Sequence, residues 1–196
     1  MYQVQQPKMR VLKRNGQYEE VSFDKILNRI KSLSQGPEFK NPLSIDETLI
    51  AQKVVQEIYD GVKTTELDEL SSQISIAMYS KNPEFKILAS RIVISNHHKN
   101  TKDTFSEKIE ELYNYHSKGQ HKPLIAEYMY QLVMKHRTEI DSAIDYHKDY
   151  DFDFFGFKTL EKSYLYKTDG KIVERPQDML MRVSLAIHRT NLKEAF

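Results

Sequence analysis

The sequence contains no cysteine, and it has no apolar run near the roughly 20 residues that a transmembrane helix needs. Without cysteine, the chain can form no disulfide, no cysteine-ligated zinc site and no thiol-based catalytic site. Its opening stretch, MYQVQQPKM, also lacks the apolar segment of a secretory signal. We therefore expect a soluble, cytoplasmic protein with no membrane partner.

An excess of charge of one sign is also missing. The 196 residues include 29 basic and 28 acidic side chains, for a formal net charge of +1. Proteins that bind nucleic acids usually show a basic excess or stripe, so we expect no nucleic-acid partner. A balanced total still allows a local basic pocket for phosphate groups.

Two common nucleotide-binding motifs are absent. The sequence has no G-x-x-x-x-G-K-[ST] and no G-x-G-x-x-G, which excludes a P-loop and a Rossmann fingerprint. We also expect no metal site. Adjacent residues on a helix point about 100° apart, so we interpret His97 and His98 as surface side chains. Asp149, Asp151 and Asp153 have the spacing of a calcium loop but lack its glycine and its final glutamate.

The first half of the chain predicts a β-hairpin followed by four helices within residues 10–100. Two short strands, 11–13 and 18–22, flank Asn15-Gly16, which favours a type I′ turn. The apolar period then becomes helical, with Asp24 as the expected N-cap. Further on, Ser44 and Glu47 have the spacing of a capping box for the second helix.

The second half, residues 101–196, predicts mainly helices. We expect a short helix over 105–118 and a longer one over 122–144, with Pro123 near its first turn. The aromatic, acidic stretch 145–157 shows no clear period, and its phenylalanines are interpreted as core anchors. A second hairpin is expected around Asp169-Gly170, followed by a helix that begins at Pro176.

Three cations surround the first hairpin turn and the first helix. Lys13 and Arg14 precede the turn, and Lys25 lies in the first turn of the helix. A polyphosphate next to these cations and to the free N–H groups of a helix start would be held by charge-assisted hydrogen bonds. The alternative is that the cations are solvated and protect an edge strand from pairing. The residues alone leave both interpretations open.

The segment VLKRNGQYEEVSFDKILNRI resembles the opening of the ATP-cone, a regulatory module of ribonucleotide reductase large subunits. YDGVKTTELDEL and PEFKILASRIVISNHHK resemble later parts of the same module. The segment DYDFDFFGFKTLEKSYLYKTDGKIVERPQDMLMRVSLAIH is similar to the region that leads into the catalytic barrel of eukaryotic and viral enzymes.

The resemblance implies a fold that is mainly α with small β-hairpins, of the α+β class. It implies a flexible N-terminus over 1–9, an ATP-cone of a hairpin and four helices over 10–100, and a helical part of the catalytic region over 101–196. The ten-stranded α/β barrel of the family would begin beyond residue 196, so the catalytic region is expected to be truncated.

The resemblance also implies an allosteric site for ATP as activator or dATP as inhibitor, with Mg²⁺ as the accompanying ion. It assigns no catalytic residue and no protein metal ligand. The nucleotide-binding residues that it implies lie in the hairpin, the first helix and two later helical junctions: Lys13, Arg14, Glu19, Glu20, Val21, Ser22, Phe23, Asp24, Lys25, Ile26, Thr64, Asp68 and Lys99.

The resemblance further implies partners and a role in making deoxyribonucleotides for DNA synthesis. Other large subunits would contact the cone, and the radical-bearing small subunit would complete the enzyme. The family reduces ribonucleotides with cysteines, so this chain alone is expected to be inactive. A transcriptional regulator that joins an ATP-cone to a zinc ribbon would need four cysteines. A helical protein-interaction module without a ligand stays open as the alternative.

Overall fold

The computed structural model describes residues 9–196, which form two compact units that divide between Asn96 and His97. Residues 1–8 of the expected flexible N-terminus lie outside the described residues. Both units consist mainly of helices with small β-hairpins, which confirms the expected α+β class. No helix within residues 9–196 is long and apolar enough to cross a membrane.

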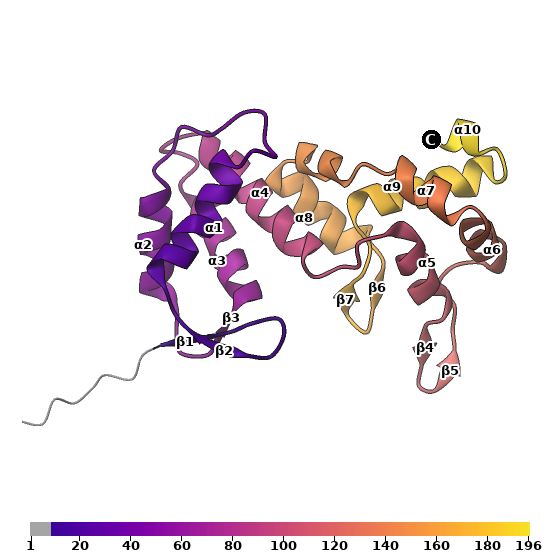
Figure 1. Cartoon of the computed structure of the whole chain (residues 1–196), viewed down its shortest axis with the longest axis horizontal. Coiled ribbons are helices and arrows are strands. Elements are labelled where there is room, and N and C mark those ends of the chain that lie inside the picture. Colours follow the sequence, from indigo (N-terminus) through magenta and orange to yellow (C-terminus); the bar gives the residue numbers. More distant parts are fainter. Residues whose placement is uncertain (1–8) are drawn as a thin grey trace, which may run out of the picture. The chain divides into compact units, whose positions relative to one another are not determined.

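The first unit is a three-stranded sheet with four helices (Figure 1). The strand order is β2-β1-β3, in which β1 pairs antiparallel with β2 and parallel with β3. The third strand, two residues long, was not predicted. The elements are β1 (Arg10–Leu12), β2 (Tyr18–Glu20), α1 (Phe23–Gln35), α2 (Glu47–Glu57), β3 (Val62–Lys63), α3 (Thr64–Ala77) and α4 (Glu84–His98).

The helices of the first unit bury one apolar face each against a common core. Ile30 and Leu33 of α1 lie against α2, whose Ile50 and Val54 are fully buried. These residues repeat at spacings of three and four, as an amphipathic helix requires. The buried guanidinium of Arg91 donates to the carbonyl of Leu33 at 3.1 Å and so fixes the end of α1 against α4.

The hairpin turn differs from the predicted type I′ turn. The N–H of Gly16 donates to the carbonyl of Lys13 at 2.9 Å, and the N–H of Lys13 donates to the carbonyl of Gln17 at 2.8 Å. Gly16 has a φ of 81°, whereas Asn15 is not in the left-handed region. This is the pattern of a type I turn followed by a left-handed glycine. Arg14 therefore lies inside the turn, where strand alternation does not fix its direction.

The predicted caps of two helices were also wrong. Ser22, not Asp24, caps α1, because its Oγ accepts the backbone N–H of Lys25 at 3.4 Å. Asp46, not Ser44, caps α2. The carboxylate of Glu47 does not complete a capping box. It is buried and accepts the hydroxyl of Ser34 and the amide of Gln35, at 2.6 and 2.7 Å, so it joins α2 to the end of α1.

The second unit contains seven helical segments and two further hairpins among its described residues (Figure 1). Its core is apolar and centres on α5, α6, α7 and α9. The elements are α5 (Phe105–Tyr113), β4 (His116–Ser117), β5 (Gln120–His121), α6 (Glu127–Lys135), α7 (Arg137–Ala143), the 3₁₀ helix η1 (Tyr146–Asp151), α8 (Phe154–Ser163), β6 (Lys167–Thr168), β7 (Lys171–Ile172), α9 (Pro176–His188) and α10 (Leu192–Ala195).

Several predicted elements of this unit are confirmed and others are wrong. The hairpin around Asp169-Gly170 and the helix from Pro176 are present. The helix predicted over 105–118 ends at Tyr113, and the hairpin β4–β5 follows it. The helix predicted over 122–144 is divided into α6 and α7 at His136. The stretch 145–157, in which the sequence shows no clear period, contains η1 and the start of α8.

A buried ionic network joins α5 to the start of α9. The Nζ of Lys108 donates to Oδ2 of Asp178 at 2.7 Å, and both side chains are almost fully buried. The hydroxyl of Tyr146 donates to Oδ1 of the same carboxylate at 2.5 Å. Burial lowers the pKa of Lys108 to about 8, although the charge of Asp178 opposes the shift. Each of these buried polar groups therefore depends on the others to offset the free-energy cost of its removal from water.

His97 and His98 are not the surface side chains that the sequence predicts. His97 is 5% exposed, and its Nε2–H donates to the carbonyl of Glu174 at 2.9 Å. Nε2 of His98 lies 2.7 Å from Oδ2 of the buried Asp149. Burial lowers the pKa of His97 to about 4, although the hydrogen bond to the carbonyl of Glu174 opposes the shift. The sequence does not reveal these contacts because the partners lie 51 or more residues away.

The buried network predicts a large loss of stability for Asp178→Ala. The substitution leaves the ammonium of Lys108 buried without its carboxylate, which typically costs about 3–5 kcal/mol. Urea denaturation of the whole chain should show this loss. Glu194→Ala, at an exposed position, should stay within about 0.5 kcal/mol of the original. A loss of less than about 1 kcal/mol for Asp178→Ala would contradict the account.

His97 predicts a specific dependence of stability on pH. Its folded pKa is about 4 and the ordinary value is 6.5, so the unfolded chain takes up the proton first. The contribution of His97 to the free energy of unfolding should be constant above pH 6.5, fall as the pH drops towards 4, and change little below that. The whole change between these two limits is roughly 3 kcal/mol. Urea unfolding over this range should show a shallower slope for His97→Gln, and equal slopes would refute the assignment.

Candidate functional site

Three charged side chains of the hairpin and α1 form the lysine group, defined as Lys13, Glu19 and Lys25. The ammonium groups of Lys13 and Lys25 form ion pairs with the two carboxylate oxygens of Glu19. The lysine side chains are 43% and 67% exposed, and that of Glu19 is 26% exposed. The hairpin turn and the first turn of α1 thus bring two exposed cations to one carboxylate.

A second set of side chains forms the arginine group, defined as Arg14, Arg29 and Asp68. Nε and Nη2 of Arg29 donate to the two oxygens of Asp68, at 3.2 and 3.3 Å. Nη2 of Arg14 lies 3.5 Å from the same carboxylate and donates to Oδ1 of Asn96 at 2.6 Å. Nη1 of Arg14 lies 3.4 Å from the hydroxyl of Thr64. One carboxylate therefore receives two guanidinium groups.

The arginine group connects the turn to three helices. Arg14 belongs to the turn, Arg29 to α1 and Asp68 to α3, where Asp68 is only 7% exposed. Arg29 also donates to the hydroxyl of Ser95 on α4 at 2.9 Å. The side-chain amide of Asn96 donates to a backbone carbonyl of α3 at 3.2 Å. The position of the turn thus depends on contacts with α1, α3 and α4.

The two groups together provide four cations and two carboxylates around the hairpin. Such an excess of positive charge, next to the N-terminus of α1, suits an anionic ligand with several phosphate groups. Glu19 and Asp68 neutralise part of this positive charge. The exposed lysine group is the part that an incoming anion can reach most easily.

The other predicted site residues follow the strand β2 into the first turn of α1. Ser22 is the N-cap, and the backbone N–H of Val21 donates to the carbonyl of Met9 at 2.9 Å. Val21, Ser22, Phe23 and Ile26 are half-buried, while Glu20 and Asp24 are exposed. Lys99 follows α4 in the second unit, so its part in the site stays a prediction.

Three residues of the site were missed from the sequence: Arg29, Ser95 and Asn96. Arg29 follows Lys25 by four residues and so lies on the same face of α1, a spacing that could have revealed it. No comparable signal marks Ser95 and Asn96, because their partners are 66 and 82 residues away in the sequence.

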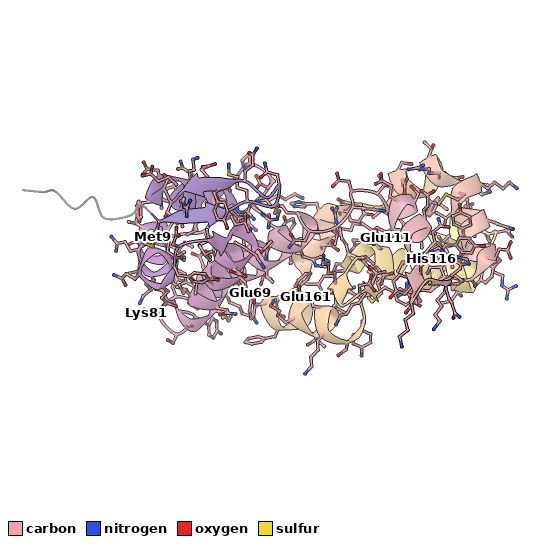
Figure 2. All side chains as sticks on the ribbon, turned by 90° about the horizontal axis from the view of Figure 1, so that it is seen from below. Met9, Glu69, Lys81, Glu111, His116 and Glu161 are labelled. Carbon is pink, nitrogen blue, oxygen red and sulfur yellow. The ribbon has the colours of Figure 1, made fainter. Side chains whose placement is uncertain are left out.

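The first unit also contains an open groove of about 840 Å³ that includes none of the predicted site residues. Its apolar lining includes Leu43, Leu49, Met78 and Phe85. Lys81, labelled in Figure 2, belongs to its polar edge. Within residues 9–196, no three histidine, aspartate or glutamate side chains are grouped so as to hold a metal ion.

Comparison with known proteins gives two family matches. Residues 9–100 match the ATP cone domain, and residues 150–195 match the all-alpha domain of ribonucleotide reductase. Over nearly the whole chain, the sequence is similar to proteins named ribonucleoside-diphosphate reductase large subunit. The identity is 47% over 190 residues for Dictyostelium discoideum, 48% over 189 for Monkeypox virus and 46% over 189 for Danio rerio.

These alignments cover 95–96% of this chain but only 22–24% of the relatives. The chain thus spans less than a quarter of the length of these curated relatives. The match to the ATP cone domain includes every predicted site residue, Lys99 among them.

The arginine group predicts that Asp68→Asn destabilises the chain. The substitution removes the charge that two guanidinium groups share, and hydrogen bonds to charged groups contribute about 1.5–3 kcal/mol. Chemical denaturation should show a loss of about this size. Glu57→Gln removes an exposed carboxylate from α2 and should have almost no effect. Equal stability of the two variants would show that Asp68 does not hold the turn.

Proposed function

We propose that the first unit binds ATP or dATP as an allosteric effector, because residues 9–100 match the ATP cone domain and nearly the whole chain is similar to ribonucleoside-diphosphate reductase large subunits. The proposed site consists of the lysine and arginine groups with the half-buried residues between β2 and α1. The family match supplies the class of ligand, and the convergence of four cations on the hairpin supports its position.

Glu19 has a specific part in this proposal. Its carboxylate holds the positions that phosphate oxygens would take next to Lys13 and Lys25. A bound triphosphate would displace it, because several phosphate oxygens compete with one carboxylate for the same two ammonium groups. The exposure of both lysines lets the exchange proceed without disturbing the core.

In this proposal the arginine group would contact the nucleoside part of the ligand rather than its phosphates. Thr64 and Asp68 offer a hydroxyl and a carboxylate on α3, and Arg14 contacts both. ATP and dATP differ by one 2′-hydroxyl, and a single hydrogen bond contributes about 0.5–1.5 kcal/mol. A difference this small must bias an element with two arrangements if it is to switch activity. The hydrogen-bonded turn around Arg14 is such an element in this proposal.

Mg²⁺ would accompany the nucleotide mainly through its phosphate oxygens, as this ion usually binds with few protein ligands. The described residues of the chain form no metal cluster of their own.

Catalysis and assembly are proposals at the level of the whole enzyme. The relatives are named ribonucleoside-diphosphate reductase large subunits, and the family's reduction chemistry requires cysteines that these 196 residues lack. We propose that the chain regulates this reduction but does not perform it alone. Its partners would be other large subunits, through the cone, and the small subunit. A ligand-free interaction module is not favoured, since the ATP cone match covers the first unit.

Calorimetric titration with ATP and dATP tests the site. Lys25→Gln should weaken the binding of both nucleotides, because it removes one phosphate contact. Glu19→Gln should instead raise the affinity for both by roughly two- to fivefold, since it removes the competing carboxylate of an exposed ion pair. Raised salt should weaken binding by screening the charges.

Glu57→Gln is the matched control, because it removes an exposed carboxylate from α2, outside the site. The original chain should bind ATP in a saturable manner. No saturable binding would overturn the proposed function itself. Saturable binding that neither Lys25→Gln nor Glu19→Gln changes would keep the function but place the nucleotide elsewhere.

A further inference from the structure

The hairpin β4–β5 places two histidines side by side in the second unit. His116, labelled in Figure 2, lies directly opposite His121 in the antiparallel pair. A two-residue turn joins the strands, and its Lys118 and Gly119 both have positive φ, 54° and 77°. The next pair outward is hydrogen-bonded, because the N–H of Lys122 donates to the carbonyl of Tyr115 at 2.8 Å. His116 and His121 therefore form a non-hydrogen-bonded pair, in which opposite side chains approach closely.

Both rings are exposed, and backbone contacts fix their tautomers. Nδ1 of His116 lies 2.7 Å from the carbonyl of Asn114, and Nε2 of His121 lies 2.7 Å from the carbonyl of Tyr113. A carbonyl oxygen only accepts, so these two nitrogens carry the hydrogens. In the neutral rings, Nε2 of His116 and Nδ1 of His121 therefore hold free lone pairs.

We propose that His116 and His121 form a binding site for a divalent transition-metal ion of the zinc and copper class. Metal-binding histidines usually donate their second N–H to a carbonyl or carboxylate, which is the arrangement of both rings here. Imidazole nitrogen suits Zn²⁺ and Cu²⁺, whereas Mg²⁺ and Ca²⁺ prefer oxygen ligands. The site is thus distinct in chemistry from the Mg²⁺ of the nucleotide.

The spacing of the rings agrees with a shared ion. Their centroids are 5.3 Å apart, with an angle of 43° between the planes. A zinc ion about 2.0–2.1 Å from one nitrogen of each ring, at a tetrahedral angle, would hold the centroids roughly 5 Å apart. The ring of His121 also contacts Tyr113, which stacks on Tyr130 with centroids 4.1 Å apart. This stack restrains the hairpin on the side of α6.

The site would be open, with two protein ligands and the other positions filled by water. The described residues contain no group of three metal-binding side chains, so no third protein ligand is assigned. The affinity should accordingly be lower than that of a structural zinc site with four ligands.

Zinc titration by calorimetry, on the whole chain and without nucleotide, tests the site. One equivalent of Zn²⁺ should bind. His116→Ala and His121→Ala should each weaken binding by roughly tenfold or more, and the double variant should weaken it at least as much as either single one. Added Cu²⁺ should broaden the NMR signals of these two rings before those of other histidines.

His136→Ala is the matched control, because His136 is another partly exposed histidine and lies 3.4 Å from the carboxylate of Glu139. Its zinc affinity should stay within about twofold of the original. Circular dichroism should show that all variants keep their helices. The proposal is overturned if Zn²⁺ does not bind at about 1 mM. It is also overturned if either hairpin variant binds as the original does, or if His136→Ala weakens binding as much as they do.

Discussion

The proposed site of the first unit depends on one interaction. The carboxylate of Asp68 pairs with the guanidinium groups of both Arg14 and Arg29. Asp68 is nearly buried on α3, so its charge needs both partners to offset the loss of water. Buried ion pairs contribute little net stability compared with apolar packing, but they are costly to break. Their main consequence here is geometric, because they fix the turn of the hairpin and the face of α1 relative to α3.

The charges around the hairpin divide by exposure into two parts with different physical roles. The arginine group is partly buried and hydrogen-bonded to α3 and α4, so it determines the structure of the site. The lysine group is exposed, and solvent weakens its ion pairs, so a phosphate can replace Glu19 at small cost. A site of this kind can be stable when empty and still accept a highly charged ligand. The proposed effectors, ATP and dATP, carry several negative charges of the kind that such a site suits.

How much the sequence could predict depended on the distance between interacting residues. The cations Lys13, Arg14 and Lys25 lie within thirteen residues, and local patterns with the family resemblance were enough to select them. Asn15-Gly16 suits more than one turn type, so the hairpin was predicted correctly and its turn was not. Contacts such as Arg14 with Asn96, or His97 with Glu174, join residues 77 or more positions apart, and periodicity carries no information on them. The hairpin 116–121 was missed for a different reason: its paired residues are close in the sequence, but the helix predicted over 105–118 extended into it.

The most direct test of the central claim is an NMR titration of the chain with ATP, which reports the position of the nucleotide residue by residue. The account predicts that backbone amide signals shift along residues 13–29 and 64–68, and that the side-chain signals of Arg14 and Arg29 shift with them. It predicts no comparable change along the groove that includes Leu43 and Phe85. Shifts confined to that groove or to the second unit, with the hairpin unchanged, would contradict the account.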